Sequence, residues 1–198
     1  MTVAETSEPG GRAPAPTLLR TVQQFLNTND VEGRYDALAT TRDLRKWLLE
    51  RRLIARSARV NEDDRDRAIS LREALRTLLI ARDEGGTGRK ATAELEHISG
   101  DAGLYVRMGP DSWQLAASRA GVDAVWARLI GDVSRAMSEG SWARLKACRR
   151  DACRWVFWDA SRNVSGEWCS MRICGNRMKG VAFRDRHARR RSCKEAGR

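Results

Sequence analysis

The chain has 198 residues, 41% hydrophobic and 32% charged, which suits a soluble globular protein with one ordinary domain and a small one. It has no run of about 18 apolar residues, which excludes a transmembrane helix, and its N-terminus lacks the apolar segment of a signal peptide. Five cysteines, an odd number, favour metal ligands and free thiols over disulfides, so we expect a reducing cytoplasm.

The sequence predicts helices in the first half of the chain, after a polar N-terminal segment. Residues 1–16 are rich in Pro, Gly, Ala and Glu, and we expect them to be disordered. Apolar residues at helical spacing then predict a helix from Thr17. A second helix, capped by Thr40 or Thr41, buries Leu44, Trp47 and Leu48, and a third begins near Asn61 and ends at the glycines 85, 86 and 88.

In the next segments the spacing of apolar residues changes once, from helical to alternating. A short helix is expected over 91–98, and alternating residues on both sides of the turn GPDS predict a β-hairpin of residues 104–108 and 113–117. Residues 119–139 return to helical spacing, and Gly140 marks a domain boundary. We therefore predict a mainly α fold with a small β-hairpin (α+β), as a helical domain over 17–140 and a module over 141–198.

Four of the cysteines form two matched pairs in that module, Cys148 and Cys153 followed by Cys169 and Cys174. The spacing C-x4-C-x15-C-x4-C predicts two loops that each give two thiolates to one tetrahedral Zn²⁺. Four protein ligands leave no open position, so the zinc should be structural. No catalytic constellation is recognisable in residues 1–140 and the chain has only two His, so we do not expect an enzyme.

Two residues beyond the second pair are alternative ligands. His187 and Cys193 both lie in the run RDRHARRRSCK, and either could replace a cysteine of the quartet. We favour the four-cysteine site, because its spacing repeats, and regard Cys193 as a free thiol.

The positive charge is concentrated beside the cysteines. From Cys148 to Arg198 there are 14 Lys and Arg against 5 Asp and Glu, a net charge of +9 out of +11 for the whole chain. A helix is expected from Asn176 to about Arg191, and a surface of this kind fits nucleic-acid phosphates. Its candidate contacts are Arg177, Lys179, Arg184, Arg186, Arg189, Arg190 and Arg191.

The run DACRWVFWDASRNVSGEWCSMRICGNRMK resembles the CGNR zinc finger, whose signature contains Cys174-Gly175-Asn176-Arg177 after a WCSM-like run. The resemblance covers about residues 144–190. Trp158 stands where that family has a smaller aliphatic residue, and the linker GEW is less basic than usual.

The upstream region resembles the partner domain of that finger, the ABATE or stress-induced transcription regulator domain. The residues that carry this likeness are Phe25-Leu26-Asn27-Thr28, Asp43-Leu44 with Trp47-Leu48, and Leu71-Arg72-Glu73-Ala74-Leu75-Arg76. The resemblance implies a bacterial transcription regulator that binds double-stranded DNA through its finger and senses a small effector or forms a homodimer through its N-terminal domain. Asn27, Thr28 and Arg72 are then candidates for an effector pocket, although helix capping and surface pairing explain them more simply.

Two other functions compete with DNA binding. The basic helix could meet an acidic protein surface, which would make the module a zinc-stabilised protein-interaction domain. It could also bind structured RNA.

Overall fold

The computed structural model describes residues 8–196, and the side chains beyond His187 in the last helix lie outside that description. Six α-helices, three strand pairs and three short turns follow one another within it. In chain order they are η1 (Pro9–Gly11), α1 (Thr17–Leu26), β1 (Asn29–Asp30), β2 (Tyr35–Asp36), α2 (Thr41–Glu50), α3 (Glu62–Asp83), α4 (Arg89–Asp101), β3 (Leu104–Met108), β4 (Trp113–Ala117), α5 (Val122–Ser138), η2 (Ser141–Arg144), β5 (Leu145–Ala147), β6 (Val156–Trp158), η3 (Met171–Gly175) and α6 (Asn176–Ala196).

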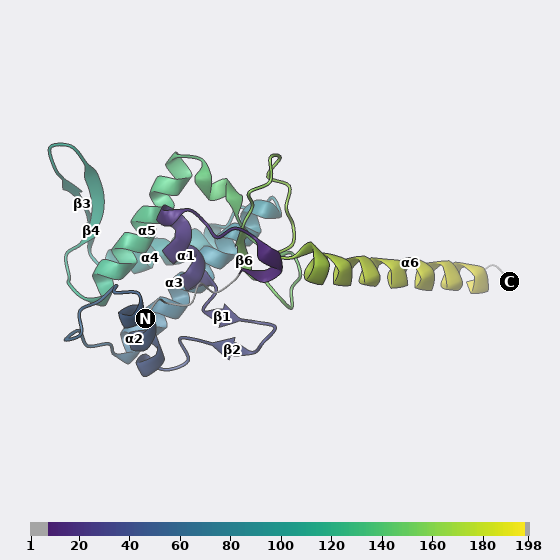
Figure 1. The fold of residues 1–198 in the computed structure, drawn as a ribbon, viewed down its shortest axis with the longest axis horizontal. Coiled ribbons are helices and arrows are strands. Elements are labelled where there is room, and N and C mark those ends of the chain that lie inside the picture. Colours follow the sequence, from purple (N-terminus) through teal and green to yellow (C-terminus); the bar gives the residue numbers. More distant parts are fainter. Residues whose placement is uncertain (1–7, 197–198) are drawn as a thin grey trace.

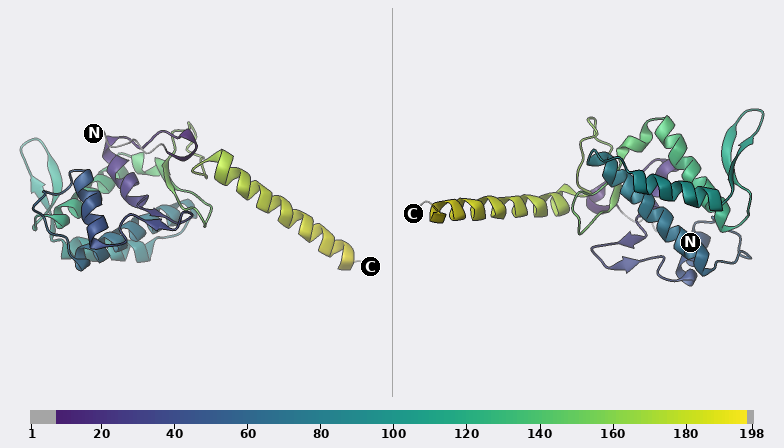
Figure 2. Two further views of the ribbon diagram at one scale, coloured as in Figure 1. Left: turned by 60° about the horizontal axis from the view of Figure 1, so that its bottom comes forward. Right: turned by 180° about the vertical axis from the view of Figure 1, so that it is seen from behind.

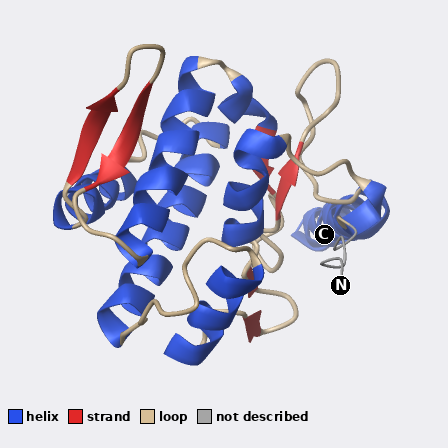
Figure 3. Ribbon diagram, turned by 60° about the vertical axis from the view of Figure 1, so that its left-hand side comes forward, coloured by secondary structure: helices blue, strands red, loops and turns tan. Residues whose placement is uncertain are grey.

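The core lies where α1, α3 and α5 pack together, with α2 and α4 on the outside (Figures 1 and 3). Trp126 of α5 is fully buried at its centre. The ring of Phe25 from α1 lies 5.7 Å from the ring of Trp126 and 5.7 Å from that of Trp47 on α2. Burial of these rings, together with that of the surrounding leucines, stabilises the packing of the helices.

The predicted helix starts are confirmed by their caps. The Thr40 hydroxyl accepts from the backbone N–H of Asp43, and Asn61 caps α3 through Asp64 in the same way. In both cases the acidic side chain accepts in return from the backbone of the cap residue, which completes a capping box. The buried face of α2 consists of Leu44, Trp47 and Leu48, as predicted.

The mainly α fold with small antiparallel strand pairs is confirmed. The pair β3–β4 has the predicted bounds; β4 contacts α5, and the tip of the hairpin projects from the body (Figure 1). The sequence did not predict the pairs β1–β2 and β5–β6, because strands of two or three residues are too short to show a period of two. Among residues 8–196, no helix is both long and apolar enough to cross a membrane.

Within residues 8–196, the last helix differs from the others in having no helix beside it. Figures 1 and 2 show α6 leaving the cysteine loops and projecting from the body as a single rod. It is rich in arginine and only weakly amphipathic, so it has no apolar stripe with which to pack on the core.

Residues 8–16 differ from the disorder predicted for residues 1–16. Ala15 is buried, and its N–H donates to the side chain of Gln23 at 2.7 Å. The turn η1 lies beside the start of α6 (Figure 1), where Arg12 and Glu8 contact the cysteine module. Composition could not predict this path, because it depends on partners more than 140 residues away in the chain.

Candidate metal centre and basic helix

The four cysteines are presented by two loops of different kinds. Cys148 directly follows β5 and Cys153 precedes β6, so the first loop is the tip of a short hairpin. Cys169 lies in a bend two residues before η3, and Cys174 lies in the π-type turn η3 that leads into α6. A backbone hydrogen bond from Arg149 N–H to the carbonyl of Glu167, 3.0 Å long, holds the two loops together.

The sulfur atoms lie at the spacing that a tetrahedral metal requires. All four are buried, and their ligand atoms lie within 4.8 Å of one another. The Sγ of Cys169 is 3.7 Å from that of Cys153 and 3.6 Å from that of Cys174. A Zn–S bond of about 2.3 Å in a tetrahedron puts sulfurs about 3.8 Å apart, and a disulfide needs about 2.05 Å. The cluster therefore fits a metal and not a disulfide.

The thiols by themselves cannot all ionise in this space. Hydrogen bonds from the neighbouring thiols lower the pKa of Cys148 to about 2, and the hydrogen bond with Cys148 raises the pKa of Cys153 to about 12. The pKa of Cys169 is raised by its hydrogen bonds with Cys148 and Cys153. A divalent cation removes this conflict, because each thiolate then faces the cation and all four are stable at neutral pH.

Asp159 fixes the connector between the two cysteine loops. It is completely buried, accepts from the N–H of Ser161 at 3.0 Å and of Gly166 at 2.6 Å, and lies 3.3 Å from the ammonium of Lys146. Burial raises the pKa of Asp159, but hydrogen bonds from Ser161 and Gly166, with Lys146, lower it to about 2 overall. A Cβ on Gly166 would lie 2.8 Å from an Asp159 oxygen, so only glycine fits there.

The N-terminal segment crosses the second cysteine loop. Arg12 donates to the carbonyls of Trp168 at 2.7 Å and Cys169 at 2.8 Å, and its guanidinium lies 4.2 Å above the ring of Phe157. The carboxylate of Glu8 accepts from the indole of Trp155 at 3.1 Å. Arg12 therefore satisfies carbonyls beside a metal ligand and covers an aromatic ring, a role that no sequence pattern indicated.

Gly175 has a steric reason to be glycine. A Cβ there would lie 3.1 Å from the ring of Trp168 and 2.5 Å from the sulfur of Met171. The backbone between Cys174 and the start of α6 therefore lies too close to these side chains for a Cβ. Trp168 itself is packed against the cysteines.

The alternative ligands are not part of the described cluster. The ring of His187 lies 4.2 Å from that of Phe183, one turn away on the exposed part of α6, with the two ring planes tilted by 53°. The side chain of Cys193 lies outside the described residues. The structure therefore brings together the four cysteines that the spacing predicted.

The candidate phosphate contacts fall into two groups. Arg177, Lys179, Arg184 and Arg186 are exposed on α6. Arg189, Arg190 and Arg191 belong to the same helix, but their side chains lie outside the described residues. Arg177 also forms an ion pair with Glu32 of the N-terminal domain, which the sequence did not predict.

Asn27, Thr28 and Arg72, the candidates for an effector pocket, are engaged in contacts within the fold. Arg72 is 2% exposed and donates to both carboxylate oxygens of Asp36, at 2.7 and 2.8 Å, to the Thr28 hydroxyl at 3.1 Å and to Glu73 at 2.8 Å. Asn27 binds the backbone of Val156 through both its side-chain polar atoms. These contacts connect the end of α1, β2, α3 and β6.

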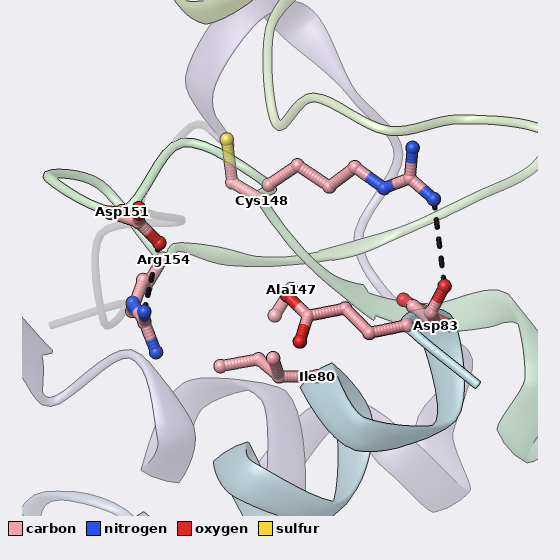
Figure 4. A pocket seen from close by; sticks show the side chains of 8 residues that line it. Ile80, Asp83, Ala147, Cys148, Asp151 and Arg154 are labelled. Carbon is pink, nitrogen blue, oxygen red and sulfur yellow. Dashed lines mark hydrogen bonds and ion pairs between the residues drawn. The ribbon is translucent and has the colours of Figure 1, made fainter. Parts of the chain in front are cut away.

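A shallow pocket lies between the end of α3 and the first cysteine loop (Figure 4). It is lined by residues that include Ile80, Asp83, Ala147 and Cys148. The side chain of Cys148 points away from Ile80, so its sulfur belongs to the four-cysteine cluster and not to the pocket.

The fold and the site together define a helical domain joined to a small four-cysteine zinc-finger module. Comparison with protein families agrees: the model of the ABATE family, described as "Putative stress-induced transcription regulator", matches residues 19–156, and that of the CGNR zinc finger matches residues 144–187. The chain therefore belongs to the ABATE family and carries a CGNR zinc finger. No curated protein matches it.

Proposed function

We propose that the protein is a transcription regulator whose cysteines hold one structural Zn²⁺ and whose helix α6 binds double-stranded DNA. The supporting observation is the connection between the two features: Cys174, a buried ligand, lies in η3, and α6 begins two residues later at Asn176. A metal at the cluster fixes the first turn of a cationic helix that the rest of the fold leaves exposed.

The charge of the site supports a nucleic-acid partner. Four thiolates and one Zn²⁺ carry a charge of −2, yet the exposed cations of α6 leave its surface strongly positive. In this proposal the zinc has a structural role and no catalytic one, because four cysteines complete its coordination. We expect the protein to act in the bacterial cytoplasm.

A competition experiment tests the choice of partner. The zinc-loaded protein is bound to a labelled DNA duplex, and unlabelled duplex DNA, structured RNA or an acidic protein is then added. The proposal predicts that duplex DNA displaces the label at the lowest concentration. Displacement by RNA or by the acidic protein at lower concentration would favour one of the alternative functions.

The hairpin β3–β4 supports a homodimer as part of the same proposal. Met108 and Trp113 are paired across its strands, so they share one face, and their exposed fractions are 69% and 74%. Large apolar side chains with this exposure are typical of surfaces that a partner covers. Sedimentation should show a dimer that Trp113→Glu disrupts, and a monomer at all concentrations would contradict it.

A further inference from the structure

An open cleft lies at the point where the cysteine module passes into α6. Its walls carry four arginines and one asparagine, with the side chains of Ile173 and Val181 between them. The polar lining residues are Arg150, Arg172, Asn176, Arg177 and Arg184. Arg150 comes from the first cysteine loop and the others from η3 and α6, so the cleft depends on both halves of the module.

One carboxylate of the N-terminal domain reaches the edge of this cleft. Glu32, on the turn between β1 and β2, accepts from Nη1 of Arg150 at 2.6 Å with one oxygen and from Nη1 of Arg177 with the other. Two guanidinium groups that converge on one oxyanion form the arrangement by which arginines hold a phosphate. The carboxylate thus occupies the position of an anionic ligand.

Arg150 is also coupled to the metal cluster. The same Nη1 lies 3.9 Å from the sulfur of Cys174, and the pKa of Arg150 is raised, first by its hydrogen bond with Glu32. The position of this guanidinium therefore depends on the folded cysteine loops as well as on Glu32.

A hydrogen bond within the turn between β1 and β2 fixes the backbone next to Glu32. The N–H of Gly33 donates to the side chain of Asp30 at 2.9 Å, and a Cβ on Gly33 would collide with the same carboxylate. The side chain of Glu32 is 40% exposed, so it can leave the arginines without unfolding the domain. The hydrogen bond from Arg150 lowers the pKa of Glu32, which keeps it charged.

We propose that the arginines of this cleft bind a backbone phosphate of duplex DNA, and that Glu32 pairs with two of them, Arg150 and Arg177, in the free chain and so weakens DNA binding. The inference rests on the proposed function, because it assigns one contact within the DNA-binding surface. It adds Arg150 and Arg172 to the residues that contact the backbone and connects the N-terminal domain to the affinity of the finger. Binding then requires the phosphate to displace Glu32 from Arg150 and Arg177.

The experiment compares Glu32→Gln with a matched control. Glu139→Gln also replaces an exposed carboxylate that is paired with an arginine, Arg135 at 2.7 Å, and it changes the net charge by the same amount. Affinity for a labelled DNA duplex of random sequence is measured by fluorescence anisotropy at fixed salt. We expect Glu32→Gln to bind about three to ten times more tightly than the unaltered chain, and Glu139→Gln to differ by less than about twofold.

The outcomes separate this inference from the proposed function. If the unaltered chain binds DNA and Glu32→Gln binds equally or less well, the inference is wrong and the proposed function stands. If neither protein binds, both are wrong. If only Glu32→Gln binds, both are supported, with Glu32 as a strong inhibitor.

A second variant tests whether Glu32 acts through the arginines. In a chain with Arg177→Gln, the gain from Glu32→Gln should shrink, because one of its two partners is gone. A gain as large as in the unaltered chain would show a general charge effect and would overturn the inference. Zinc content, measured on each variant, serves as the control for folding of the module.

Discussion

Asn27, the residue that directly follows α1, forms two hydrogen bonds with the backbone of Val156. Its side-chain oxygen accepts from the Val156 N–H at 2.8 Å, and its amide donates to the Val156 carbonyl at 2.8 Å. Val156 is fully buried and lies in β6, directly after the first cysteine loop. The end of α1 and the cysteine module are therefore joined by a contact that spans 129 positions of the chain.

Asn27→Ala should destabilise the protein by about 1–3 kcal/mol, because the buried N–H of Val156 loses its acceptor and the Val156 carbonyl keeps only the longer hydrogen bond from Gln23 at 3.3 Å. Urea unfolding followed by tryptophan fluorescence measures the effect. Asn163→Ala, on an exposed loop, is the control and should change stability by less than about 0.5 kcal/mol. Equal stability of the two variants would show that the contact does not join the domains.

Cys174→Ser should remove the metal and unfold the module, because the site loses one of its four ligands. In small metal-binding modules the free energy of metal binding stabilises the folded state. Zinc content, measured by mass spectrometry of the native protein, should fall from one per chain to near zero. Cys193→Ser is the matched control and should keep its zinc. The opposite pattern would mean that Cys193 is a ligand.

Arg12→Ala should speed the release of zinc to a chelator and lower stability by about 1–3 kcal/mol. The variant leaves the carbonyls of Trp168 and Cys169 without their donor and uncovers the ring of Phe157. Arg42→Ala, at an exposed position of α2, tests for a general effect of lost charge. Identical release rates in the two variants would show that Arg12 does not stabilise the metal centre.

Asp159→Asn should lower the free energy of unfolding by about 1–3 kcal/mol at neutral pH, because the connector loses a charged acceptor. The pKa of Asp159 is lowered to about 2, so its contribution is complete above about pH 4 and is lost as the pH falls towards 2. The difference in stability from the unaltered chain should therefore be constant between pH 5 and 8. Asp151→Asn, whose side chain is 90% exposed, is the control. A difference that varies across this range would contradict the assignment.

Replacing Arg189, Arg190 and Arg191 by Ala should weaken DNA binding by about tenfold or more for all sequences, because phosphate contacts carry no sequence information. Zinc content should not change. A chain with Arg42, Arg56 and Arg59 replaced by Ala is the control, since these exposed arginines lie in the N-terminal domain. An equal loss of affinity in the control would attribute binding to net charge instead of to α6.

The helices, their caps and the hairpin β3–β4 could be predicted from the sequence, because their signals are local. Thr40 with Asp43 forms a capping box within four residues, and the cysteine pairs repeat one spacing. The metal cluster was predictable for the same reason, since two cysteine pairs of the same spacing contain its ligands.

The contacts between the two halves could not be predicted. Arg12, Asn27 and Glu32 each act on residues more than 100 positions away, and none stands in a recognisable pattern. The family resemblance made Arg72 a candidate ligand residue, and the structure shows it buried and paired with Asp36, a partner that no local pattern indicates.

The affinity for duplex DNA as a function of salt concentration, with zinc bound and after its removal, tests the central claim most directly. The zinc-loaded protein should give a log–log slope of about −4 or steeper, because several cations of α6 each displace a counterion from a phosphate. Removal of the metal should reduce the affinity at every salt concentration. An affinity that barely changes with salt, or that survives metal removal unchanged, would contradict zinc-dependent DNA binding.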